Sequence, residues 1–404
     1  MRRAFWSSLA VLAAVATGCS QIADPGPVDD SVLNQSLALP AVVNGMSLSL
    51  SRALGYLAYT GAAESKEVVA SGSLTLFGIT TKQRQGVLDP GTSETNDHWE
   101  FAQQARWVAE DGVRRMRASL GDQFAKSPYA AEALVDVGFT NRLLGENMCD
   151  GVIDGGPIQP RKVYFERAEA AFTEALAVAT AAGNTNLALA ARAGRASVRV
   201  WLSNWSGASD DAKTIPSSFV YSAKYSAVQL DQYNRIYWAN SNQPYRAHSV
   251  SGTFYQGYYL ATKDPRTSWA TNPAIRFGTQ GTVPWLFQTK YVARDSPIDL
   301  VSGHEMRLIV AEALLRSGDW PGAVSNINQL RAEVGVTPWA AANATDAWIA
   351  LKTERGIELW LEGRRLGDLS RWIADATPGA VEDMSGRDLC FPVGQNERDS
   401  NPNI

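Results

Sequence analysis

Apolar residues along most of this chain recur every three or four positions, the period of an amphipathic α-helix. Side chains at this spacing share one face of a helix, and that face packs against a neighbouring element. The pattern predicts helices over residues 47–62, 99–120, 129–144, 164–181, 187–202, 305–317 and 321–334. Thr95, Asn96 and Asp97 are candidate N-caps for the second helix, because short polar side chains accept hydrogen bonds from a first helical turn.

Part of this helical pattern repeats. An offset of 115 residues places residues 203–208 on residues 318–323 and Ala196 on Ala311. A helix, a polar turn, an aromatic residue and then Ala in a second helix is similar to the tetratricopeptide repeat. The spacing of the second helix recurs once more in Ala168, Phe172 and Ala175. Such helix pairs stack and bury each other's faces, so we predict an all-α, tetratricopeptide-like helical-repeat (α-solenoid) scaffold.

The helical period fails over residues 219–300, which we predict to be loop-rich. Residues 219–291 hold 16 of the chain's 38 aromatic residues, interspersed with Asn, Gln, Ser, Thr and Gly. Aromatic faces beside amides and hydroxyls suit a sugar chain, whose C–H faces stack on rings while its hydroxyls are hydrogen-bonded. We select as candidate stacking platforms Tyr245, Tyr255, Tyr258 and Trp269. In the alternative interpretation these rings fill a core beneath long loops.

A second irregular stretch, residues 78–97, is predicted to be a long loop, and loops of this length in a compact body are often functional. Its polar side chains could line a binding site. Within and just after it, Arg84, Asn96 and Trp99 are candidate polar and aromatic partners of the stacking platforms.

Residues 1–18 have the form of a signal peptide. Two Arg residues precede an apolar stretch that ends in small residues directly before Cys19. The segment resembles the lipobox of bacterial lipoproteins, in which the cysteine becomes the acylated N-terminus; Ala16 stands where Leu is usual. The alternative is an ordinary secretory signal. We expect residues 19–45 to be a tether and N-terminal extension of a single body spanning residues 19–404.

Composition excludes several classes of protein. With 45% hydrophobic and 19% charged residues, the chain is neither a disordered tail nor a polytopic membrane protein. Its 37 basic and 41 acidic residues offer no basic surface for nucleic acid. Because the chain has only three dispersed His residues, we predict neither a metal centre nor a cofactor. Beyond Cys19, Cys149 and Cys390 could form a disulfide or remain two buried thiols.

Catalytic signals are weak. Glu354, Glu358 and Glu362 recur every four residues, so they would share one helix face, and paired carboxylates carry out glycoside hydrolysis. The same segment is rich in opposite charges, which favours a structural ion-pair network. These are Arg355, Arg364, Arg365, Asp368 and Arg371. Residues 150–156 are glycine-rich and acidic but lack the ligand alternation of a calcium loop, so we predict a turn.

Three stretches together resemble the SusD/RagB family of outer-membrane nutrient-binding lipoproteins. They are residues 307–314, residues 354–365 with the following Asp368-Leu369, and the terminal residues 391–397 and 401–403. Gly394 stands where the family's terminal box usually has Pro. The resemblance implies a tetratricopeptide-like scaffold with a loop-rich irregular half, and a binding protein rather than an enzyme. It also implies a cell-surface lipoprotein that passes oligosaccharides or other large nutrients to a TonB-dependent (SusC-like) transporter.

Three hypotheses follow. The leading one is a lipid-anchored receptor, on the extracellular face of the outer membrane, for a glycan or another large nutrient. The second is a periplasmic helical-repeat lipoprotein that binds other proteins; its aromatic segment would be wholly buried. The third is a lipoprotein glycosidase that uses Glu358 and Glu362, which unchanged turnover in Glu358→Gln, or pairing of both carboxylates with Arg, would exclude.

Overall fold

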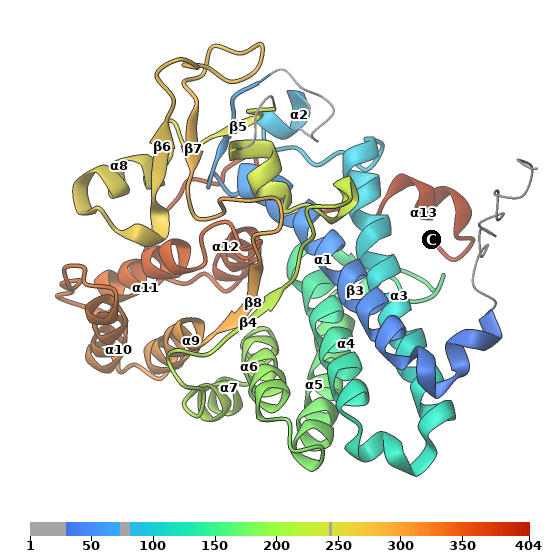
Figure 1. Ribbon diagram of the computed structural model, residues 1–404. Helices are drawn as coiled ribbons and strands as arrows, with labels where there is room; N and C mark the ends of the chain where they lie inside the picture. The colour runs from blue at the N-terminus through green and yellow to red at the C-terminus, as the bar shows by residue number, and fades with distance from the viewer. Residues whose placement is uncertain (1–29, 73–80, 242–244) are drawn as a thin grey trace, which may run out of the picture.

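Every helix predicted from the hydrophobic period is present, although the first two begin well before their predicted starts. The computed structural model of the protein describes residues 30–72, 81–241 and 245–404, so the signal peptide and Cys19 lie outside the described residues. The predicted helices are α1 (Leu39–Glu64), α3 (Ser93–Leu120), α4 (Pro128–Asn147), α5 (Lys162–Ala181), α6 (Thr185–Trp201), α9 (Gly303–Arg316) and α10 (Trp320–Glu333). They stack in antiparallel pairs (Figure 1), and the all-α, tetratricopeptide-like prediction is confirmed.

Further helices complete the scaffold. Helix α7 (Trp205–Ala212) follows α6, while α11 (Ala344–Glu358), α12 (Arg365–Ala374) and α13 (Gln395–Ser400) follow α10. In Figure 1, α13 lies beside α3, and the Asn396 backbone N–H donates to the Asn96 side chain at 3.0 Å. The chain's C-terminal segment therefore returns to the first helices of the fold.

The two aligned repeat turns have the same geometry. Ser203 and Gly318 both adopt the left-handed conformation, with φ of 57° and 90°. The next residue caps the second helix in each case: Asn204 accepts from the Gly207 N–H at 3.0 Å, and Asp319 accepts from the Gly322 N–H at 2.9 Å. Of the aligned alanines, Ala196, Ala208, Ala311 and Ala323 are all fully buried at helix crossings. The two copies of the repeat thus share the backbone conformation of the turn, the N-cap of the second helix and the packing of the alanines.

The predicted start of α3 is wrong. Helix α3 begins at Ser93, and Thr92 rather than Thr95, Asn96 or Asp97 is its N-cap. The Thr92 hydroxyl accepts from the Thr95 N–H at 3.4 Å. The loop expected over residues 78–97 is correspondingly shorter, and it contains the one-turn helix α2 (Thr81–Arg84); residues 78–80 lie outside the described part of the chain.

Helix α1 starts within residues 19–45, which we expected to be a tether and N-terminal extension. Two 3₁₀ turns, Asp30–Asn34 and Ser36–Ala38, precede it, and α1 itself begins at Leu39 rather than after residue 45. Residues 36–64 are long and apolar enough to cross a membrane by length and composition. In the fold, however, the apolar face of α1 packs against α3 and α4 in the core.

The segment of residues 219–300 forms most of the irregular half. Its strands join in two-residue to four-residue antiparallel ribbons, which Figure 1 shows gathered beside the helical stack. The ribbons in the chain pair β1 (Val69–Ala70) with β5 (His248–Ser249), β2 (Asp150–Gly151) with β3 (Gln159–Pro160), β4 (Val220–Ala223) with β8 (Ile298–Ser302), and β6 (Trp269–Thr271) with β7 (Leu286–Gln288). The segment also contains helix α8 (Phe254–Thr262), which the sequence period did not reveal.

Several of the chain's tryptophans serve the scaffold through contacts with cations. The Arg316 guanidinium lies 4.7 Å from the Trp205 ring centroid and 5.1 Å from that of Trp348. The Arg371 guanidinium lies 5.8 Å from Trp205 and 5.6 Å from Trp372. A cation over an aromatic face contributes about 0.5–2 kcal/mol depending on desolvation. These alternating contacts join the α6–α7 pair to the C-terminal helices.

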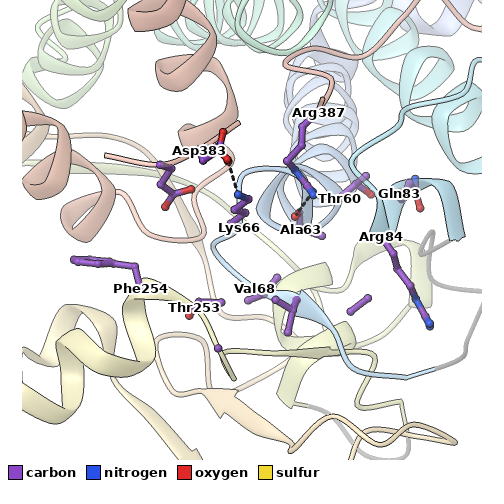
Figure 2. Close-up of a pocket in the computed structure, with 14 residues that line it drawn as sticks. Thr60, Ala63, Lys66, Val68, Gln83, Arg84, Thr253, Phe254, Asp383 and Arg387 are labelled. Carbon is purple, nitrogen blue, oxygen red and sulfur yellow. Dashed lines mark hydrogen bonds between the residues drawn. The ribbon is translucent and has the colours of Figure 1, made fainter. Parts of the chain in front are cut away.

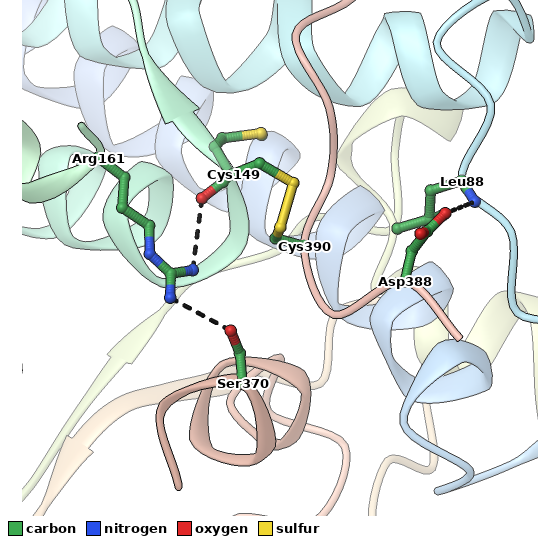
Figure 3. Close-up of a disulfide and its surroundings, with 7 residues drawn as sticks. Leu88, Cys149, Arg161, Ser370, Asp388 and Cys390 are labelled. Atoms are coloured by element: carbon green, nitrogen blue, oxygen red, sulfur yellow. Dashed lines mark hydrogen bonds between the residues drawn. A yellow bond between two sulfur atoms is a disulfide. The ribbon is translucent and has the colours of Figure 1, made fainter. Parts of the chain in front are cut away.

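Cys149 and Cys390 form a disulfide, which decides between the two alternatives left by the sequence (Figure 3). The bond joins the end of α4 to the segment before α13 across 241 residues. Neighbouring hydrogen bonds hold the same segment: the Leu88 N–H donates to Asp388 at 2.8 Å, and the Cys149 N–H donates to the Phe391 carbonyl at 2.9 Å. The disulfide therefore fastens the C-terminal segment to the first half of the scaffold.

One buried carboxyl predicts a pH dependence of stability. Burial raises the pKa of Asp136 to about 8; the Ser47 hydroxyl, donating at 2.7 Å, and Lys224 lower it, whereas Glu132 raises it. The folded state therefore binds a proton that the unfolded state, with an Asp pKa of about 3.9, has released. This contribution to the free energy of unfolding is present below pH of about 4 and is lost as pH rises towards about 8.

The Asp136→Asn variant is expected to lose this pH dependence, because the amide stays neutral at every pH. Urea unfolding between mildly acid and mildly alkaline pH should show a flatter stability profile than that of the natural protein. Asp122→Asn, at an exposed position, is the matched control and should leave the profile unchanged. An Asp136→Asn profile identical to that of the natural protein would contradict the assignment.

Candidate functional site

A cavity of about 480 Å³ lies where the helical stack meets the irregular half (Figure 2). This volume is typical of small-molecule sites, which commonly enclose about 300–1,000 Å³. The end of α1, strand β1, helix α2, the start of α8 and the C-terminal segment all contribute to its wall. The lining residues are Thr60, Ala63, Lys66, Val68, Val69, Ala70, Gln83, Arg84, Gly252, Thr253, Phe254, Glu382, Asp383 and Arg387.

Phe254 supplies the aromatic surface of the cavity. It is 46% exposed at the start of α8, and Figure 2 shows its ring at the cavity's edge. Two buried rings support it: Tyr258 stacks on it with centroids 5.4 Å apart, and Tyr255 meets it edge to face at 5.4 Å. One apolar ring is therefore held rigidly with much of its surface open to solvent.

Three cations of the lining hydrogen-bond to backbone carbonyls. Lys66 donates to the Asp383 carbonyl and Arg84 to the Gly72 carbonyl. Arg387 donates to the carbonyls of Glu64, at 2.9 Å, and Ala63, at 3.2 Å. Lys66 itself has φ of 62°, a conformation that costs a bulky residue roughly 1 kcal/mol or more. Because glycine would be cheaper there, the lysine side chain is a candidate functional group.

The acidic groups at the cavity differ in their ionisation. Burial raises the pKa of Glu64 to about 8, although the nearby Arg387 partly offsets this effect. Burial likewise raises the pKa of Glu382, with Arg365 as the main opposing charge. Hydrogen bonds from Ser385 lower the pKa of the exposed Asp383. At neutral pH the cavity thus offers cations, an ionised Asp383 and a protonated Glu64 behind the wall, a mixture of donors and acceptors suited to a polyhydroxyl ligand.

Of the seven residues selected for binding from the sequence, Arg84 lines this cavity. Tyr255 does not, because its ring is 1% exposed and stacks on Trp360 at 5.2 Å. The ring of Tyr258 is also buried beneath Phe254, and its hydroxyl donates to Asp264 at 2.9 Å. Neither ring has a face open to a ligand, which corrects their selection as stacking platforms.

Asn96 and Trp99 likewise support the fold. Trp99 is buried in the core, and the Asn96 side chain accepts from the Asn396 N–H at 3.0 Å. A Cβ on Gly394 would approach the Asn96 oxygen to 2.8 Å, so the terminal box needs glycine here. Both residues serve to seat the C-terminal box against α3, which corrects their selection as ligand contacts.

Tyr245 and Trp269 are half-buried and lie outside the lining of this cavity. Tyr245 packs on Trp238 with centroids 4.6 Å apart, and Trp269 meets Tyr259 edge to face at 5.9 Å. Their role in binding stays a prediction. The sequence analysis did not select Phe254, whose ring is exposed at the cavity. Residues 254–259 contain four aromatic residues, and their exposure depends on helix α8, which the sequence period did not reveal.

The glutamates considered for catalysis form the core of an ion-pair network, as predicted, but with other partners than those expected. Arg266 holds Glu354 at 2.7 Å and Glu358 at 2.8 Å, and Lys290 holds Glu362 at 2.6 Å. Helix α11 ends at Glu358, so Glu362 does not continue its face. Burial would raise the pKa of Glu358, but His304 and Arg266 hold it below its ordinary value. With each carboxylate paired to a basic side chain, the cluster is structural.

The acidic, glycine-rich residues 150–156 form part of the β2–β3 hairpin and its turn, as predicted. Among the residues that the structure describes, no group of three or more His, Cys, Asp or Glu side chains is arranged to hold a metal ion.

The C-terminal quarter and the whole fold point to the same class of protein. The family model described as SusD family matches residues 304–404. A SusD-like carbohydrate binding protein from Bacteroides vulgatus has the same fold, with a TM-score of 0.69, 16% identity, and coverage of 92% of this chain and 97% of that one.

A laminarin binding SusD-like protein gives a TM-score of 0.65 at 14% identity, covering 92% of this chain and all of the other. A SusD superfamily protein from Bacteroides thetaiotaomicron gives 0.65 at 14% identity, covering 92% and 98%. Among curated proteins no sequence matches this chain. The resemblance to the SusD family is confirmed, with the family model matching residues 304–404, and the fold of the whole chain is similar to that of solved SusD-like proteins.

Proposed function

We propose that this protein is a lipid-anchored receptor of the outer membrane that binds a glycan, or another large nutrient, and delivers it to a TonB-dependent transporter. The observation that carries the proposal is the cavity at Phe254, where one open ring lies among charged and polar groups. A ring that stacks on a sugar face and side chains that bond its hydroxyls are the usual means of recognising carbohydrate. The carbohydrate-binding relatives with the same fold support this ligand class.

The alternative of a protein-binding periplasmic scaffold requires the aromatic segment to be wholly buried. Phe254 and Phe277 are both exposed, which favours the receptor. The glycosidase hypothesis required free carboxylates at Glu358 and Glu362, and each has a basic partner. We therefore take the protein to bind its ligand without cleaving it.

Replacing Phe254 with Ala is expected to weaken glycan binding about 2–10-fold, because a stacked aromatic contact contributes about 0.5–1.5 kcal/mol beyond its buried area. Isothermal titration against soluble laminarin, starch and xylan fragments measures the change.

The control is Leu260→Ala, which removes another exposed apolar side chain of the same helix outside the cavity lining. This variant should bind as the natural protein does. Equal losses in both variants would assign the effect to α8 as a whole. Absence of binding to every glycan and peptide tested, together with no transporter in the purified complex, would refute the proposed function.

Lipid anchoring depends on Cys19 in this proposal. The Cys19→Ala variant is expected to move from the membrane fraction to the soluble fraction, because the residue that carries the acyl chains is lost. Immunoblots of separated membranes measure the distribution, and surface labelling of intact cells distinguishes the extracellular from the periplasmic face. A variant that stays in the outer membrane would show that Cys19 is not the anchor.

Transporter binding is tested by affinity purification from detergent-solubilised membranes. A TonB-dependent barrel that copurifies with the natural protein supports delivery to it. A complex that contains periplasmic proteins and no barrel would instead support the scaffold alternative.

A further inference from the structure

Trp107, on the outer face of α3, is unlike the other tryptophans that the structure describes. Its side chain is 54% exposed, whereas Trp99 on the same helix is buried and the remaining described tryptophans are buried or half-buried. An indole offers the largest aromatic face among side chains, and this one belongs to an exposed residue. The exposed amide of Gln104 lies three residues earlier, so both side chains share one face of the helix.

A second cavity, of about 280 Å³, lies beside this ring. Its lining consists of Gln103, Gln104, Arg106, Trp107, Val152, Asp154, Gly155 and Glu397, none of which lines the cavity at Phe254. The volume is near the lower limit for small-molecule sites, so it suits one sugar ring rather than a chain. The polar side chains belong to three separate elements: α3, the β2–β3 hairpin and α13.

The base of this second cavity is rigid. Arg106 is 3% exposed and each of its nitrogens donates: Nε to Gln103 at 3.1 Å, Nη1 to Glu110 at 2.7 Å and Nη2 to Asp154 at 2.8 Å. Gln103 is itself fixed, because its amide donates to the Tyr164 hydroxyl at 2.7 Å. A ligand would therefore meet side chains that are already ordered, which lowers the entropic cost of binding.

The two outer walls are tied to each other. Asn401 donates to the Gly156 carbonyl at 3.0 Å and to Glu397 at 2.9 Å, and Asn403 donates to the Gly155 carbonyl at 2.8 Å. The Cys149–Cys390 disulfide joins the segments that lead into both walls. These bonds hold the hairpin turn and α13 together, and the Arg106–Asp154 pair ties the turn to α3.

The charges of the cavity select among ligands. The single cation, Arg106, has two carboxylate partners, Glu110 and Asp154, and Glu397 adds a further negative charge to the described lining. Because carboxylates outnumber the cation, the cavity disfavours ligands that carry a negatively charged phosphate, sulfate or uronate group. Carboxylates accept hydrogen bonds from hydroxyls, amides both donate and accept, and the indole face stacks on C–H groups.

We propose that Trp107 and this cavity form a second glycan contact, which binds one neutral sugar ring stacked on the indole. For its ligand class the inference rests on the proposed function. The site is separate from the cavity at Phe254, because the two cavities share no lining residue.

The test is fluorine NMR on protein labelled with fluorotryptophan, in which Trp107→Phe identifies the resonance of Trp107. Maltose, cellobiose, laminaribiose and xylobiose are added one at a time at millimolar concentration. The expected result is a saturable shift of the Trp107 resonance with at least one of them, retained in Phe254→Ala. Gln104→Ala should weaken this response, whereas Tyr129→Ala, at another exposed ring, should leave it unchanged.

A Trp107 resonance that no saccharide moves overturns the inference. If saccharides move other resonances and not this one, the inference fails while the proposed function stands. If no glycan binds by calorimetry either, both fail. A Trp107 signal that changes only when a copurified membrane protein is added would assign this surface to a protein partner, and would also overturn the inference.

Discussion

Replacing Arg364 with Met is expected to lower the free energy of unfolding by about 3–5 kcal/mol, because the buried Glu305 carboxylate loses its ion-pair partner, while Glu146 keeps only Arg142, at 3.7 Å. Arg364 is buried, and its guanidinium bonds Glu146 at 3.1 Å and Glu305 at 2.8 Å. Both carboxylates are themselves almost completely buried. Met has a similar length and no charge, so the loss reflects the ion pairs more than the packing.

Urea or guanidinium unfolding monitored by circular dichroism measures this change. Lys162→Met is the control, since the Lys162–Glu166 pair is exposed on α5 and such pairs contribute about 0–1 kcal/mol. A loss in Arg364→Met no larger than that of Lys162→Met would contradict the assignment. Arg364→Lys should recover only part of the stability, because an ammonium cannot reproduce the forked geometry of the guanidinium.

Arg364 also explains why the charged stretch of residues 354–371 has a structural role. It lies between α11 and α12 and bonds Glu146 of α4 and Glu305 of α9, elements far apart in the chain. Arg371 acts in the same way, bonding Glu312 of α9 at 2.6 Å. The charged residues of this stretch therefore join the early and late helices of the scaffold, and they leave the ligand to be recognised elsewhere.

The scaffold could be predicted because its signals are local. The period of apolar residues lies within each helix, and the Asn204 and Asp319 caps act on N–H groups three residues away. Helix α8 was not predicted, because its nine residues are apolar on several sides and show no clear helical period that would distinguish them from a loop. The cap of α3 was missed because Thr92, Thr95, Asn96 and Asp97 are all capping residue types, and sequence gives no means to choose among them.

The binding residues were harder to predict, because exposure is a tertiary property. Tyr255 and Phe254 are adjacent aromatic residues, yet one is buried against Trp360 and the other is open to the cavity. Arg84, selected from a polar, irregular stretch, lines the cavity, and its role in binding stays a prediction. The partners of Glu358 and Glu362 were not found, since Arg266 and Lys290 lie about 70–90 residues away in the irregular half.

Removal of the Cys149–Cys390 disulfide is expected to lower the free energy of unfolding by about 2–5 kcal/mol. The bond closes a loop of 241 residues, and cross-linking a long loop restricts the unfolded chain most strongly. The Cys149→Ser/Cys390→Ser double variant, made with Cys19→Ala so that no other thiol takes part, should unfold at lower denaturant concentration than Cys19→Ala alone.

Reductant distinguishes the cross-link from the side chains that carry it. Dithiothreitol should destabilise the Cys19→Ala protein to the level of the triple variant and leave the triple variant unchanged. The hairpin turn and α13 are each fastened close to this bond, so reduction should also weaken the saccharide response of Trp107 before the scaffold unfolds. Stability that does not respond to reductant would contradict a role for the bond in holding the C-terminal segment, since the hydrogen bonds around Phe391 and Asp388 would then suffice.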